Sequence, residues 1–94
     1  MAITEMERVI KELGLIGIEI SSNANGKNLD DPEIPKIFEA SAKMDVPILV
    51  HPWATVCEER MPEYNMYSIR MPSETALAVG SLIFSGIFDK YPNI

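Results

Sequence analysis

The chain has 94 residues, of which 47% are hydrophobic and 23% charged, with a formal net charge of −6. This length allows one small domain or a part of a larger one, and the hydrophobic content suffices for a folded core. The acidic balance argues against a nucleic-acid-binding protein, because phosphates require a basic surface, and against docking on an anionic membrane.

Localisation is predicted from the cysteine content and the hydrophobic runs. The single cysteine, Cys57, cannot form an internal disulfide, which favours a reducing compartment, and we expect a cytoplasmic protein. The N-terminus lacks the pattern of a signal peptide. The longest run without charge, residues 75–88, is too short and too rich in Gly and Ser to span a bilayer. We therefore expect one domain over residues 1–94, with no membrane partner.

The chain begins with a predicted helix and a predicted strand. Thr4 and Glu7 are typical of a capping box, in which each side chain satisfies the free backbone N–H of the other. Gly14 is the expected stop, because glycine adopts the left-handed conformation without a steric cost. Residues 15–20 then predict a strand whose isoleucines share the face that meets helices, with Glu19 on the other face as a possible polar group near a site.

A polar segment and a second helix follow this strand. Residues 21–28 predict a loop by composition. Asn23 in this loop is a candidate for reaching a ligand, although loop asparagines more often close turns. The second helix is expected to start with Asp31 as N-cap and Pro32 at the first helical position, and to end near Asp45.

The second strand ends in the only histidine of the chain. Residues 46–50 are apolar and β-branched, which favours a strand buried on both faces of a parallel sheet. His51 ends the strand, because Pro52 removes a ladder donor. Ligands of such sheets bind beyond the carboxyl ends of the strands. His51 is therefore a candidate metal ligand or acid–base group, and the alternative is a hydrogen-bonded histidine without chemistry.

The region after the second strand is a long polar connection over residues 54–71. Loops of this length often have a function. Cys57 has no Cys or His at ligand spacing, so we treat it as non-catalytic. The acidic pair at residues 58 and 59 is interpreted as a solvated charge pair.

The last helix is expected to start at Pro72 or Ser73, with Glu74 near its N-terminus, where the helix dipole favours a negative charge. Residues 76–88 are apolar nearly all round, so this helix should be buried. Several small residues would let another backbone approach closely. These are Gly80, Ser81, Ser85 and Gly86.

Four segments, in this order, resemble one branch of the amidohydrolase superfamily, which contains aminocarboxymuconate-semialdehyde decarboxylase and the resorcylate-type decarboxylases. The segments are Gly17–Asn23, Leu29–Pro32, Val50–Trp53 and Met71–Thr75. The resemblance implies an α/β fold, namely a parallel βαβα segment of a (β/α)₈ TIM-type barrel. The chain would form its middle third, with the fourth and fifth strands and their helices.

The resemblance also implies a divalent metal, most often zinc, at the C-terminal mouth of the intact barrel. Its ligands are a His-x-His or Glu-x-His pair on the first strand, a histidine ending the fifth strand and an aspartate from the eighth. His51 matches the fifth-strand ligand. Trp53 would lie at the substrate mouth, where it could stack on an aromatic or muconate-type carboxylate or instead cap the core. Asn23 is the second substrate-binding candidate.

The other ligands, and an assisting histidine after the sixth strand, have no counterpart in these 94 residues. A catalytic zinc needs about three protein ligands, so we expect no metal and no activity in the chain alone, and we assign no catalytic residue. Two functions remain open. In the first, the chain is a piece of a metal-dependent hydrolase or of a decarboxylase, which is a carbon–carbon lyase. In the second, it is a non-catalytic barrel segment that self-associates.

A homo-oligomer is expected in either case. A two-strand piece of a barrel has unpaired strand edges and apolar faces that the rest of a barrel would cover. We expect a large apolar interface between copies of the chain. Gly80, Ser81 and Gly86 are the predicted points of close contact.

Overall fold

The order of elements along the chain follows the predicted alternation of helices and strands. The computed structural model describes residues 2–53, 60 and 66–94, so Cys57 and the acidic pair at 58 and 59 lie outside the described residues. The elements are α1 (Ala2–Lys11), β1 (Ile18–Ser21), β2 (Asn23–Ala24), β3 (Lys27–Asn28), α2 (Lys36–Met44), β4 (Ile48–His51), η3 (Met66–Arg70), α3 (Met71–Phe84) and α4 (Ile87–Lys90).

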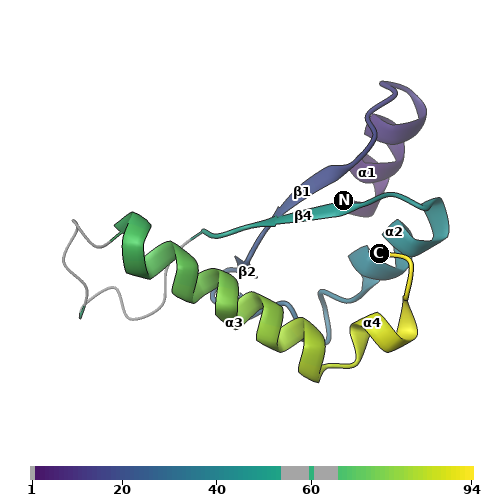
Figure 1. Cartoon of the computed structure of the whole chain (residues 1–94). Helices are drawn as coiled ribbons and strands as arrows, with labels where there is room; N and C mark the ends of the chain where they lie inside the picture. The colour runs from purple at the N-terminus through teal and green to yellow at the C-terminus, as the bar shows by residue number, and fades with distance from the viewer. Residues whose placement is uncertain (1, 54–59, 61–65) are drawn as a thin grey trace.

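Strands β1 and β4 form a parallel pair, as predicted, in a register that runs from Ile18 opposite Ile48 to Ser21 opposite His51. The α2 helix lies between them in sequence, and Figure 1 shows α2, α3 and α4 gathered on one side of the pair. Side chains alternate along a strand, so the pair has one face toward the helices and one open face. His51 lies on the open face.

The open face corrects the prediction that the second strand is buried on both sides. Leu49 is 60% exposed, whereas Ile48 and Val50 pack against the core. The reason is that helices cover one face of β1 and β4 in the part of the chain that the structure describes. The other face presents Glu19, Ser21, Leu49 and His51, which are all exposed.

The core lies between the sheet and the helices. Its fully buried members come from the segment before α2 and from α2, α3 and α4. They are Leu29, Phe38, Ala78, Leu82 and Ile87. The prediction that the last helix is buried all round is wrong for this chain, because Phe84 is 92% exposed and Ile83 is 55% exposed. Only one side of α3 faces the core, so its other side remains an apolar surface.

The helix boundaries differ from the predicted ones. Gly14 has the expected left-handed conformation, with φ +69°, but α1 already ends at Lys11, three residues before it. However, α1 begins at Ala2, so Thr4 lies inside the helix rather than at its cap. The last helix begins at Met71, just before the predicted start at Pro72 or Ser73. It ends before Gly86, whose φ of +72° separates α3 from α4.

The second helix begins at Lys36 rather than near Asp31. A second proline, Pro35, explains the delay, because the residue before a proline is disfavoured in the helical region. The Asp31 carboxylate instead accepts a hydrogen bond from the backbone N–H of Glu33 at 3.1 Å. The predicted cap therefore closes a turn, and the helix starts after both prolines.

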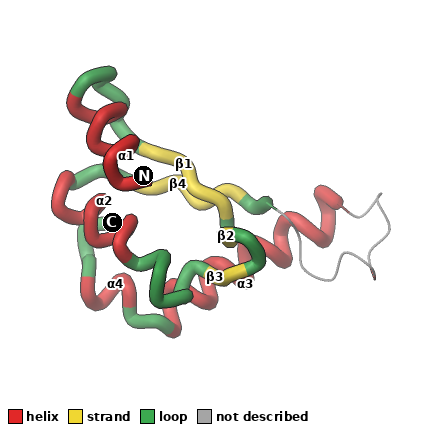
Figure 2. The backbone as a smooth tube through the Cα atoms, turned by 180° about the vertical axis from the view of Figure 1, so that it is seen from behind, coloured by secondary structure: helices red, strands yellow, loops and turns green. Residues whose placement is uncertain are grey.

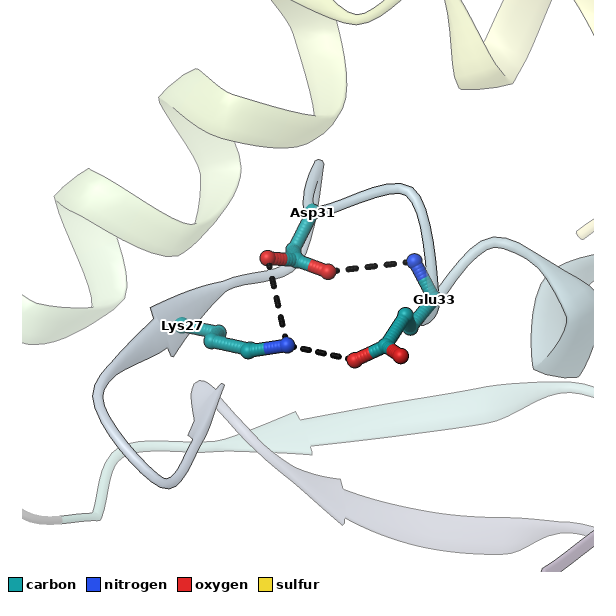
Figure 3. Close-up of polar contacts among 3 residues, drawn as sticks. All are labelled: Lys27, Asp31 and Glu33. Atoms are coloured by element: carbon teal, nitrogen blue, oxygen red, sulfur yellow. Dashed lines mark hydrogen bonds and ion pairs between the residues drawn. The ribbon is translucent and has the colours of Figure 1, made fainter.

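The predicted loop after β1 contains a small antiparallel hairpin, formed by β2 and β3 and visible from behind in Figure 2. Its turn is Asn25–Gly26, with φ +52° and +77°, the pattern of a type I′ turn. Lys27 binds the carboxylates of Asp31, at 3.7 Å, and of Glu33, as Figure 3 shows. The hydrogen bond to Glu33, followed by the charge of Asp31, raises the pKa of Lys27.

Candidate functional site

The candidate site lies where β1 and β4 end side by side. Ser21 is paired with His51 in the sheet register, and the backbone N–H of Ser22 donates to the His51 carbonyl at 2.9 Å. His51 is the last residue of β4, as predicted, and its side chain is exposed. The hydrogen-bonding pattern therefore fixes the main chain of His51 against β1 and presents the imidazole on the open face.

A set of hydrogen bonds continues beyond the strand ends and is here named the strand-end network, formed by Ser22, Asn23, Trp53 and Glu74. The Ser22 hydroxyl accepts from the Trp53 backbone N–H at 3.1 Å and donates to Glu74 Oε1 at 2.9 Å. Asn23 Nδ2 donates to the Trp53 carbonyl at 2.6 Å and to Glu74 Oε1 at 2.8 Å. The network connects β1, the segment after β4 and the first turn of α3.

Two of the predicted site residues lie around one pocket. Trp53 and Asn23 both line a pocket of about 740 Å³ whose apolar wall includes Ile20 and Ile37. The Trp53 side chain is 67% exposed, so it borders the pocket rather than capping the core. His51 is not among the residues that line this pocket. The structure thus places Trp53 and Asn23 together and places His51 at the neighbouring strand end, on the open face.

Asn23 has a structural role in addition to its place in the pocket. Besides its two contacts in the strand-end network, its Oδ1 accepts a hydrogen bond from the Gly26 backbone N–H at 3.3 Å. This contact closes the hairpin turn, as asparagines in loops commonly do. The turn-closing alternative considered for Asn23 is therefore present, and substrate binding by Asn23 stays a prediction.

Ser22 and Glu74 are site residues that sequence reasoning missed. Glu74 was expected near a helix N-terminus as a favourable charge, yet its side chain is 2% exposed and faces the strand ends. Ser22 is equally buried. Both residues belong to the segments that resemble the amidohydrolase superfamily, and this resemblance was the one sign in the sequence that they could belong to the site. The periodicity of α3 could not reveal a buried carboxylate, because the partner residues are about fifty positions away.

The described residues place one imidazole, that of His51, at the strand ends. No group of three or more His, Cys, Asp or Glu side chains in residues 2–53, 60 and 66–94 is arranged to hold a metal ion. An exposed imidazole at a strand end is a suitable zinc ligand, but a catalytic site needs about three protein ligands. A metal at His51 would need further ligands from outside this set. Within the same ranges, no helix is long and apolar enough to cross a membrane.

Comparison with known proteins gives consistent matches. The amidohydrolase family matches residues 2–94. The chain is 49% identical over 94 residues to 2-amino-3-carboxymuconate-6-semialdehyde decarboxylase from Dictyostelium discoideum, a match that covers 99% of this chain and 26% of that protein. The chain thus spans about a quarter of the length of this curated relative.

Solved structures show the same arrangement of elements. An amidohydrolase-like protein from Staphylococcus aureus matches with a TM-score of 0.83 and 30% identity, over 98% of this chain and 34% of that chain. A dihydroxybenzoic acid decarboxylase from Polaromonas sp. JS666, with bound manganese and the inhibitor 2-nitroresorcinol, matches with a TM-score of 0.77 and 27% identity, over 98% of this chain and 31% of that chain.

Proposed function

Because the chain belongs to the amidohydrolase family, we propose that it is the middle segment of a metal-dependent decarboxylase or hydrolase with a (β/α)₈ barrel. In this assignment β1 and β4 are the fourth and fifth barrel strands, and the open face of the pair is the barrel interior. The main support is the match over residues 2–94, together with the parallel pair that ends at His51. The single cysteine favours a cytoplasmic enzyme.

His51 is the proposed metal ligand of this segment. Its imidazole is exposed on the open face, at the carboxyl end of β4, where ligands of parallel α/β barrels bind. A divalent metal bound there would supply positive charge that stabilises the negative charge that develops on the substrate during the reaction. Zinc suits an imidazole ligand, and the Polaromonas relative holds manganese. The remaining ligands would come from other parts of the intact enzyme.

Trp53 and Asn23 are the proposed substrate-binding residues. The exposed indole offers an aromatic face on which a small aromatic or muconate-type carboxylate can stack. Asn23 lines the same pocket and donates to the Trp53 carbonyl, so it sets the position of this wall relative to β1. Both residues act in binding and orientation, and no proton transfer is assigned to the described part of the chain.

The proposal is tested with a chimera in which residues 1–94 replace the matching segment of the Dictyostelium decarboxylase. We expect decarboxylation of its aminocarboxymuconate substrate and a bound divalent metal. His51→Ala should abolish both the turnover and the metal content. Ser41→Ala is the matched control, because its hydroxyl is buried near the start of β4 and contacts the Val46 carbonyl. A folded His51→Ala chimera that retains stoichiometric metal and turnover would contradict the proposed role.

A second candidate function, self-association without catalysis, is favoured by the exposed apolar surfaces. Val79, Ile83 and Phe84 form an exposed apolar side of α3. Apart from the neighbouring backbone of α3 itself, no atom of the described residues lies within 4 Å of the position that a Cβ at Gly80 would occupy, so a partner helix could approach there. Ser81, by contrast, is buried in the core of the chain, which leaves Gly80 as the better contact point.

A further inference from the structure

Glu74 is a buried carboxylate at the centre of the strand-end network. It comes from the first turn of α3, and its Oε1 accepts hydrogen bonds from the Ser22 hydroxyl at 2.9 Å and from Asn23 Nδ2 at 2.8 Å. Hydrogen bonds to an ionised acceptor are stronger than those between neutral groups. Burial with these donors therefore makes Glu74 a fixed anchor for the residues that follow β1.

The contact with Glu74 also determines how Ser22 is oriented. A hydroxyl has one hydrogen, which can point to the Glu74 carboxylate at 2.9 Å or to the Trp53 carbonyl at 3.3 Å. The shorter and charge-assisted contact with Glu74 is preferred. The lone pairs of Ser22 Oγ are then available for the Trp53 backbone N–H, which donates at 3.1 Å. The carboxylate thus sets the acceptor for Trp53 through Ser22.

Asn23 connects the same carboxylate to the other polar group of Trp53. One amide hydrogen of Asn23 points to Glu74 Oε1 and the other to the Trp53 carbonyl, at 2.8 and 2.6 Å. Both main-chain polar groups of Trp53 are therefore bound by residues that Glu74 orients. His51, two residues earlier, is tied to the same segment by the Ser22 N–H.

We propose that Glu74 is a positioning residue that holds the main chain of His51 and Trp53 in place through Ser22 and Asn23. The inference rests on the proposed function in one respect: the roles of His51 as a metal ligand and of the Trp53 indole in substrate binding. The physical claim is that α3 acts on the strand ends through one carboxylate oxygen. Removing that oxygen should loosen residues 51–53 locally while the sheet and the core remain.

The test is amide hydrogen exchange, measured by NMR on the 94-residue chain without metal. Two amides report directly: that of Trp53, which donates to Ser22, and that of Ser22, which donates to His51. Glu74→Leu fills a similar volume without an acceptor, whereas Glu74→Gln keeps an acceptor oxygen. We expect Glu74→Leu to speed exchange at these two amides about tenfold relative to the core, as for the loss of one charge-assisted hydrogen bond. Glu74→Gln should restore most of the protection.

The matched control is Ser41→Ala, because the Ser41 hydroxyl is buried and bonds to the Val46 carbonyl, two residues before β4 begins and so far from the strand end at His51. In this variant, amide exchange at Trp53 and Ser22 should not accelerate more than exchange at other amides. Unchanged protection of Trp53 in Glu74→Leu would overturn the inference. An equal acceleration at every amide would also overturn it, since Glu74 would then act only as a core residue. The measurement needs no metal, so failure of His51 as a ligand is detected separately, by the metal content of the chimera.

Discussion

Phe84→Glu tests whether the exposed side of α3 joins two copies of the chain. Phe84 is 92% exposed in the structure, so the substitution should leave the fold of a single copy intact. Full burial of a phenylalanine side chain is worth about 1.5–3 kcal/mol. A two-fold symmetric contact uses the residue twice, so the loss is about 3–6 kcal/mol, or about a 10²- to 10⁴-fold weaker dimer. A buried, unpaired carboxylate would weaken it further.

Sedimentation velocity over a micromolar concentration range measures the effect. Thr4→Glu is the control, because it adds the same charge at an exposed position of α1. We expect the wild-type chain and Thr4→Glu to sediment as oligomers and Phe84→Glu to sediment as a monomer with an unchanged far-UV spectrum. Undiminished association of Phe84→Glu would exclude the α3 face as the contact. A wild-type monomer whose unfolding does not depend on concentration would refute self-association altogether.

Three further outcomes are expected. Phe38→Ala removes a side chain of the buried cluster and should lower the free energy of unfolding by about 3–5 kcal/mol, measured by urea denaturation, and a loss below about 1 kcal/mol would be inconsistent with this core. The pKa of Lys27 is raised above 10.5 in the folded chain, so its ion pairs with Asp31 and Glu33 stabilise the hairpin below pH 10.5. This stabilisation is lost as the pH rises through the pKa that Lys27 has in the folded chain. In Glu33→Gln, the pKa of Lys27 measured from its ¹³Cε shift should move back toward 10.5. Zinc added to the isolated chain should be removed by dialysis, and stoichiometric zinc that depends on His51 would contradict this expectation.

Much of the architecture could be predicted from local patterns. The alternation of helices and strands predicts the parallel pair, because a helix between two strands returns the chain to the end of the sheet where the first strand began, so the second strand runs in the same direction. The left-handed conformation of Gly14, just beyond the end of α1 at Lys11, likewise follows from its own conformational freedom. His51 follows an apolar run and precedes Pro52, so its place at a strand end is also a local property. The family resemblance, confirmed by the match over residues 2–94, likewise depends on short segments of sequence.

Local patterns were less reliable where two signals competed or where the partner was distant in sequence. Asp31 is a good helix cap, but Pro35 delays the helix to Lys36. The Asn25–Gly26 hairpin was predicted only as a loop, although this dipeptide is a known turn signal. The apolar composition of α3 indicated burial on all sides, yet the amount of burial depends on how many elements surround the helix.

The sequence by itself therefore determined the alternation of the main helices with the two parallel strands, the strand-end histidine and the family. The tertiary structure decided which polar residues act together there. Glu74 lies 52 residues after Ser22 and 51 after Asn23, and no periodicity relates such positions. Only the packing of α3 against the ends of β1 and β4 places the Glu74 carboxylate within hydrogen-bonding distance of both. A buried charge needs such donors, so the folded arrangement, rather than the local sequence, explains why this glutamate is stable in the interior.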